Sequence, residues 1–126
     1  IKDLINGDIN FANIETVITD EVNLVPQEKE FVFRSHPNSI RHMLDLGLNM
    51  LSLANNHAFD YGRDGIEETL KNVGLMQSEY HILQYAGVGR NLNEVSKPAV
   101  FKVRGYKIAF AAIGITSAHS RTTQKY

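Results

Sequence analysis

The stretch NMLSLANNH, residues 49–57, combines a short apolar run with three polar residues at its end. Residues 49–54 are mostly apolar, which suits a strand buried on both faces of a parallel sheet. Asn55, Asn56 and His57 follow at the carboxyl end of that strand, the edge at which open α/β sheets bind ligands. The stretch therefore predicts an α/β fold and places a candidate site at these three residues.

Helices are predicted on both sides of this strand. Before it, Pro37 opens a segment that ends near Gly47, and apolar residues recur there every three or four positions. After it, a helix begins within residues 62–65 and ends at Gly74, with glutamates in its first turn and a lysine near its end, as the helix dipole favours. The apolar positions of the two helices are Ile40, Met43, Leu44 and Leu48, and Ile66, Leu70 and Val73.

The flanking regions add further elements. Residues 8–14 alternate apolar and polar side chains and predict a strand that ends in a polar cluster. Residues 19–30 are acidic, contain a proline and predict a loop, which precedes a short apolar run at residues 31–33. Residues 85–89 predict a strand end with a tight turn, and residues 91–95 a short helical or turn element.

Two β-rich runs follow near the end of the sequence. Residues 98–103 and 107–113 are separated by the Gly-containing residues 104–106, which predicts an antiparallel hairpin. The order of strands and helices implies a mixed sheet covered by helices, with right-handed crossovers between parallel strands.

The composition is that of a globular protein, since 43% of the 126 residues are hydrophobic and 21% are charged. The 13 basic and 14 acidic residues are interspersed and sum to −1, so no nucleic-acid partner is predicted. No uncharged apolar run approaches the roughly 18 residues of a membrane span, and no cysteine is present for a disulfide or thiolate site. Residues 1–126 are expected to form one domain, an incomplete piece of a larger one, because the sequence begins without an initiator methionine.

The polar loop after residue 54 offers groups for metal and acid–base chemistry. Asn56, His57 and Asp60 carry oxygen and imidazole donors of the kind that divalent cations accept. Histidine titrates near neutral pH, so His57 would act as a general acid or hydrogen-bond a developing negative charge. Taken alone, an Asn-Asn-His loop is more often a turn whose side chains cap backbone amides.

Two motifs give this loop a specific resemblance. Residues 55–62, NNHAFDYG, resemble the Asn-Asn-His-x-x-Asp-Tyr-Gly signature of CapA-like proteins of poly-γ-glutamate capsule synthesis, and residues 13–15, Asn-Ile-Glu, resemble their upstream Asn-Leu-Glu motif. Residues 87–91, GVGRN, stand in the family's Gly-x-Gly-x-Asn position, so the resemblance covers nearly the whole chain in the right order. The signature is also similar to the Gly-Asn-His-Glu-Phe-Asp-Tyr-Gly stretch of 5′-nucleotidases, in the calcineurin-like metallophosphoesterase superfamily, with Asn55 and Ala58 as departures.

The resemblance implies a fold and a set of site residues. The fold would be part of the layered α-β-β-α sandwich of the metallophosphoesterase superfamily, whose opening Asp motif and downstream His motifs do not occur within residues 1–126. The implied cofactors are two divalent ions of manganese, zinc or iron, with Asn56 and Glu15 as metal ligands and His57 as the catalytic residue. The supporting candidates are Asn13, Asn55 and Asp60.

The same resemblance implies a role in poly-γ-glutamate capsule synthesis, by metal-dependent hydrolysis or transfer at a phosphorus or related centre. Poly-γ-glutamate or a phosphorylated substrate and other capsule-synthesis proteins are the implied partners, in the bacterial cell envelope or on its extracytoplasmic side. The alternative is a non-catalytic capsule assembly or export protein that keeps the fold without a working dinuclear site. The departures at Asn55 and Ala58 are compatible with that alternative.

Several polar residues also have structural interpretations. Asp60 would accept backbone hydrogen bonds at the start of the following helix, and Tyr61 would pack beneath the loop. His119 follows a strand end and is a further candidate, in a motif of low specificity. The histidines expected at surface or capping positions are His36, His42 and His81.

Overall fold

A three-stranded parallel sheet and two helices form the centre of the computed structural model, which describes residues 2–81 and 83–115. The sheet has the order β1-β4-β5, formed by Phe11–Asn13, Met50–Ser52 and Gln84–Ala86. In register, Ala12 lies opposite Leu51, and Leu51 opposite Tyr85. The buried parallel strand predicted within residues 49–54 is therefore the central strand of this sheet. A short 3₁₀ helix at Lys2–Leu4 precedes it.

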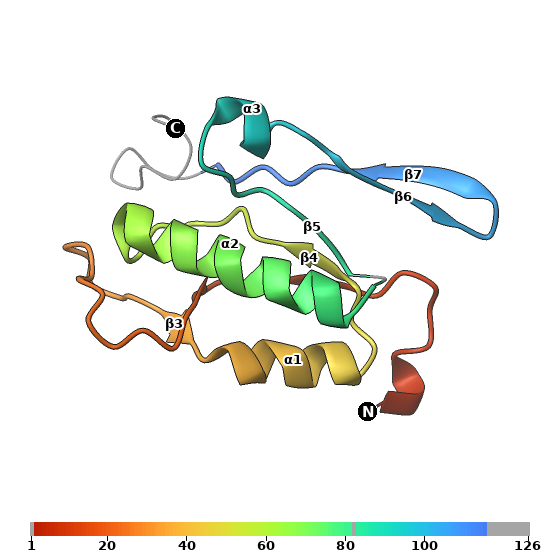
Figure 1. Cartoon of the computed structure of the whole chain (residues 1–126), viewed down its shortest axis with the longest axis horizontal. Coiled ribbons are helices and arrows are strands. Elements are labelled where there is room, and N and C mark those ends of the chain that lie inside the picture. Colours follow the sequence, from red (N-terminus) through yellow and green to blue (C-terminus); the bar gives the residue numbers. More distant parts are fainter. Residues whose placement is uncertain (1, 82, 116–126) are drawn as a thin grey trace.

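Helices α1 (Pro37–Asp45) and α2 (Gly62–Glu79) lie side by side along the sheet (Figure 1). Helix α1 begins at Pro37 as predicted, and His36 caps it because its Nδ1 accepts the Asn38 N–H at 3.1 Å. Both helices and β4 bury side chains in one core, which explains the apolar periodicity of the sequence. The members of this core are Ile14, Ile18, Ile40, Leu44, Leu51, Leu53, Val73, Met76 and Leu83.

Helix α2 continues to Glu79, so the predicted stop at Gly74 is wrong. A glycine inside a helix costs only about 0.5–1 kcal/mol relative to alanine. Met76, two residues after Gly74, is fully buried in the core. Burial of a methionine side chain contributes about 1.5–3 kcal/mol. The gain from packing the additional turn therefore exceeds the cost of the glycine.

A second parallel pair, β2 (Val17–Ile18) with β3 (Arg34–Ser35), was not predicted from the sequence. Each strand has two residues, too few to show an alternating pattern. The main chain of β2 is satisfied by α2: Ile18 N–H donates to Thr69 Oγ1 at 3.0 Å, and Asn72 Nδ2 donates to the Ile18 carbonyl at 3.1 Å. The two buried polar residues of α2 thus bind this small sheet to the helix.

The hairpin is confirmed as β6 (Ala99–Val103) and β7 (Tyr106–Phe110), after the short helix α3 (Leu92–Val95). The turn has two residues instead of three, because Tyr106 already pairs with Val103. Arg104 and Gly105 both have positive φ, 47° and 86°, as a two-residue hairpin turn of matching twist requires.

The α/β class with parallel and antiparallel strands and a C-terminal hairpin is therefore confirmed, as a partial metallophosphoesterase-like fold. Within the described residues, the parallel and antiparallel pairs lie in separate sheets. No helix in this part of the chain has both the length and the apolar character of a membrane-spanning segment.

Candidate functional site

The candidate site lies where β1 and β4 end side by side. Because the two strands are parallel neighbours, the residues that follow them meet at one edge of the sheet. Asn55 joins the two chain segments: its Nδ2 donates to the Ile14 carbonyl at 2.8 Å and approaches Asn13 Oδ1 at 3.3 Å. Its side chain is buried, so Asn55 holds the polar segment after β4 against the end of β1.

His57 is held by hydrogen bonds at its main chain and at its ring. Its backbone N–H donates to Asn55 Oδ1 at 3.0 Å, and its Nδ1 lies 2.7 Å from Asp60 Oδ2. A carboxylate can only accept a hydrogen bond, so we assign the proton of that contact to Nδ1. The other ring nitrogen, Nε2, is left directed toward Glu15, with 3.9 Å between Nε2 and Glu15 Oε1.

Asp60 is fully buried, and its carboxylate is occupied by three donors. They are the His57 ring, the Phe33 N–H at 2.7 Å from Oδ2, and the Lys29 ammonium on Oδ1. Asp60 does accept a backbone hydrogen bond, and the donor, the Phe33 N–H, lies 27 residues earlier in the chain. Tyr61 occupies the N-cap position of α2, where it makes no side-chain capping bond.

Lys29 and Phe33 belong to this site and were missed by sequence reasoning. Lys29 Nζ also donates to the Asn56 carbonyl at 2.7 Å, and the Phe33 ring stacks on His57 with centroids 4.1 Å apart and planes at 22°. Both residues lie in or beside the segment that was predicted only as an acidic loop. The available signal was that Lys29 is the one cation among residues 19–33 that could neutralise a buried aspartate.

Glu15 and Asn56, the two candidate metal ligands, both have exposed side chains. Glu15 has a side chain that is 49% exposed, and Asn56 is exposed beside His57. Among residues 2–81 and 83–115, no three His, Asp or Glu side chains come together as a metal-holding group. The donor set of the described residues therefore fits part of one ion's coordination shell and does not complete a two-metal centre.

A pocket of about 640 Å³ opens beside Asn13, Glu15 and Phe33. The rest of its lining includes β3, Tyr61 and the apolar side of α1 with Ile40 and Met43. This volume lies within the range of roughly 300–1,000 Å³ that is typical of small-molecule sites. The pocket therefore gives a ligand access to Glu15, the residue toward which His57 Nε2 is directed.

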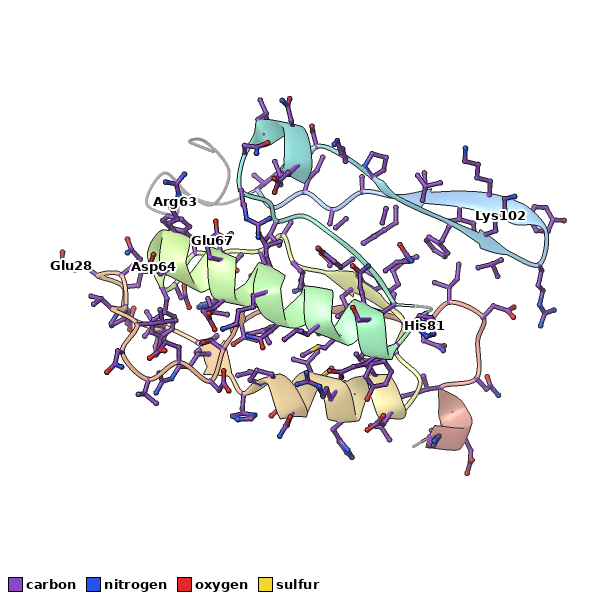
Figure 2. The ribbon with its side chains drawn as sticks, viewed as in Figure 1. Glu28, Arg63, Asp64, Glu67, His81 and Lys102 are labelled. Atoms are coloured by element: carbon purple, nitrogen blue, oxygen red, sulfur yellow. The ribbon has the colours of Figure 1, made fainter. Side chains whose placement is uncertain are left out.

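The other histidines lie apart from this arrangement. Figure 2 shows His81 at one end of α2 and Arg63 and Asp64 at the other, the end that follows the candidate site. At about 1.5 Å per residue, the helix separates these ends by roughly 27 Å. His36 caps α1, and His119 lies outside the described residues.

The fold and the site together define the class: an α/β protein of metallophosphoesterase-like architecture, with an Asn-His-Asp loop at the carboxyl ends of its parallel strands. The model of the bacterial capsule synthesis protein family, PGA_cap, matches residues 1–126. The chain belongs to this family.

Curated relatives agree with that assignment. The chain is 28% identical over 111 residues to the PGA biosynthesis protein CapA of Bacillus subtilis, a match covering 87% of this chain and 27% of the relative. It is 28% identical over 115 residues to the capsule biosynthesis protein CapA of Bacillus anthracis, covering 90% and 26%. A probable polyglutamine synthesis accessory protein of Mycobacterium tuberculosis is 32% identical over 63 residues, covering 50% and 16%. The chain thus spans about a quarter of the length of the two CapA proteins.

Proposed function

We propose that this chain supplies the Asn-His loop of a metal-dependent phosphoesterase-type centre, in a protein that acts in synthesis of a poly-γ-glutamate capsule. The observation that carries the proposal is the His57–Asp60 pair, whose free ring nitrogen is directed toward Glu15 at the ligand-binding edge of the sheet. The capsule context is supported by the family and by the biosynthetic roles for which the two CapA relatives are named.

In this proposal His57 is the catalytic residue. Asp60 accepts a hydrogen bond from Nδ1–H, fixes the ring and stabilises its protonated form, as the carboxylate of a His–Asp pair does in other hydrolases. Nε2 then donates a proton to, or hydrogen-bonds, the oxygen that gains negative charge. The Phe33 ring covers one face of the imidazole and restricts the approach of water from that side.

Glu15 and Asn56 are the residues that would hold a divalent ion. One carboxylate and one neutral amide are ligands that Mn²⁺, Zn²⁺ and iron accept, and the remaining ligands would come from outside the described residues. When bound, such ions supply a polarised phosphoryl oxygen and an activated water. Asn13 and Asn55 position the two strand ends that carry these donors.

Metal content and turnover of the intact protein test the proposal together. We expect bound metal after equilibration with Mn²⁺, Zn²⁺ or Fe²⁺, a weaker metal affinity in Asn56→Ala, and unchanged metal content without turnover in His57→Ala. Turnover is followed with a chromogenic phosphate monoester and the matching diester. Full activity and equal metal content in both variants would contradict the site assignment.

A non-catalytic assembly protein is the second candidate. It is favoured by the small number of donors, because Asp60 is occupied by its three partners and no three acidic or histidine side chains gather among the described residues. This candidate predicts that the intact protein binds no metal and that His57→Ala leaves capsule assembly unchanged. Metal stoichiometry therefore separates the two functions.

A further inference from the structure

We infer that Lys29 is a positioning residue of the candidate site, whose ammonium group fixes the loop carrying Asn56 and His57 by binding the buried Asp60 carboxylate and the Asn56 carbonyl together. This inference rests on the proposed function for its catalytic consequence, whereas its structural consequence can be measured independently. Lys29 lies in the segment that joins β2 to β3, and no motif of the sequence marks it.

The charge of Asp60 is the first reason. Its side chain is 0% exposed, and a carboxylate removed from water is costly unless a cation and hydrogen-bond donors replace the lost hydration. The Phe33 N–H and the His57 ring supply hydrogen bonds, but the lysine supplies the full positive charge. Because the Lys29 side chain is itself 25% exposed, it retains some contact with water.

The two contacts of Lys29 bracket His57 in the sequence. Its Nζ binds the carbonyl of the residue before His57 and the carboxylate of the residue three positions after it. One ammonium group therefore fixes the main chain at Asn56 and the partner of the imidazole ring at once. The position of the exposed Asn56 side-chain amide and the direction of His57 Nε2 both depend on that main chain.

The other contacts of the same segment do not use the Lys29 side chain. Gln27 N–H donates to the Asp60 carbonyl at 2.8 Å, and Phe33 donates its own N–H and stacks its ring. These bonds remain possible when the ammonium group is removed, so Lys29→Met is expected to fold. The substitution then tests the charge and the two bonds of Nζ, and keeps most of the aliphatic volume.

The experiment compares Lys29→Met, Lys29→Arg and Lys71→Met in the intact protein. Lys71 is a matched control, since its Nζ also binds a carboxylate, that of Glu68 at 2.8 Å, on the exposed surface of α2. The first measurement is the nuclear magnetic resonance signal of the His57 Nδ1 proton and the two ring nitrogens. We expect Lys29→Met to shift and broaden these signals, Lys29→Arg to restore them in part, and Lys71→Met to leave them unchanged.

The second measurement is Mn²⁺ affinity and turnover of the phosphate monoester. Loss of an outer residue that orients a metal site typically costs about 10–100-fold, and we expect a loss of that size in Lys29→Met. In an Asp60→Asn background, the further loss from Lys29→Met should stay within about twofold, because the charged contact is already lost and only the bond of Nζ to the Asn56 carbonyl remains to be removed. If Lys29→Met fails to fold, the double variant, which removes both charges, is compared with Asp60→Asn alone.

The outcomes separate this inference from the proposed function. Unchanged His57 signals in Lys29→Met, or an equal change in Lys71→Met, would overturn the positioning role whatever the activity. If the wild-type protein binds no Mn²⁺ and has no turnover while the His57 signals still depend on Lys29, the proposed function fails and the positioning role stands. Fully additive losses in the double variant would show that Lys29 does not act through Asp60.

Discussion

The loop from Asn55 to Asp60 and the hairpin of β6 and β7 are stabilised in different ways. The loop buries four of its six residues and is bound by side chains and main chain of residues 13–15 and 27–33. Every residue of the hairpin strands is at least partly exposed, and the strands are paired with each other. The contacts of the hairpin with the rest of the chain include the edge-on pair of Phe11 and Phe110, the pair of Arg104 with Asp8, and contacts between β6 and β5.

This difference places the candidate site within the buried part of the chain. The largest fully buried side chains all lie between residues 17 and 83, and Asp60 of the candidate site is one of them. Substitutions in the loop should therefore lower the free energy of unfolding as well as alter the site. Substitutions in the hairpin should have local and smaller effects.

The largest effect is expected for Asp60→Ala. Removing one partner of a buried ion pair typically costs about 3–5 kcal/mol, because the other groups are left without their acceptor. Here the Phe33 N–H and the His57 Nδ1 lose theirs. Urea unfolding should show this loss, whereas Asp8→Ala, which removes the exposed partner of Arg104, should cost less than about 1 kcal/mol. Similar losses in the free energy of unfolding of both variants would contradict the proposed difference in stability between the loop and the hairpin.

A glycine pair provides the next comparison. A Cβ at Gly65 would lie 2.8 Å from Tyr61 Cβ and 3.3 Å from Val17 Cγ1, so Gly65→Ala overpacks the contact of α2 with β2 and should cost about 1–3 kcal/mol. A Cβ at Gly105 in the hairpin turn meets no atom within 4 Å, but its φ of +86° makes alanine unfavourable by about 1–2 kcal/mol.

Thermal unfolding measures the destabilisation in both variants. Gly74→Ala serves as the control, because its Cβ would enter open space within a helix and should stabilise the protein by about 0.5–1 kcal/mol. A destabilising Gly74→Ala would show that α2 is packed more tightly around residue 74 than the structure indicates. An unchanged midpoint for Gly65→Ala would show that Tyr61 moves aside without cost.

The aromatic contact of the hairpin should have a smaller effect. The Phe11 and Phe110 rings are 5.8 Å apart at 73°, and such a pair contributes about 0.5–1.5 kcal/mol beyond its buried area. A double-mutant cycle with Phe11→Ala and Phe110→Ala measures that coupling in urea unfolding. Strict additivity would mean that the hairpin is attached to the sheet by other contacts.

The smallest effect is expected from an exposed carboxylate, Glu79. Its hydrogen bond with Arg41 lowers the pKa of Glu79 below its ordinary value of 4.5. A carboxyl group whose pKa is lower in the folded state stabilises the fold above its unfolded pKa, and this contribution is lost as the pH falls through the folded value. The free energy of unfolding should therefore decrease below about pH 4.5 by a smaller amount in Arg41→Met than in wild type. An identical pH profile in the two proteins would contradict a role for this pair.

The parts of the fold that depend on residues close together in the sequence could be predicted from it. The hairpin follows from two alternating runs around a Gly-containing turn, and α1 follows from Pro37 and its apolar spacing. The end of α2 could not be predicted, because it depends on the burial of Met76 in the core. The pair β2 and β3 could not be predicted either, because its strands are too short to show a pattern and the side chains that bind β2, Thr69 and Asn72, lie about fifty residues away.

The candidate site divides in the same way. Asn55, His57 and Asp60 lie within one short stretch, and the strand-end argument adds Asn13 and Glu15, so the structure brings together residues that the sequence had already selected. Their roles in metal binding and catalysis stay predictions. Lys29 and Phe33 reach the site from a segment without a motif, and their contribution depends on a chain path that local patterns do not encode.

The bond from Phe33 to Asp60 has a consequence for how this site varies among relatives. The donor is a main-chain N–H, which every residue except proline provides. We therefore expect position 33 to accept many residue types and to exclude proline, with a preference for flat side chains that stack on His57. Position 29, in contrast, contributes through its side chain and should covary with position 60: a neutral residue at one should accompany a neutral residue at the other.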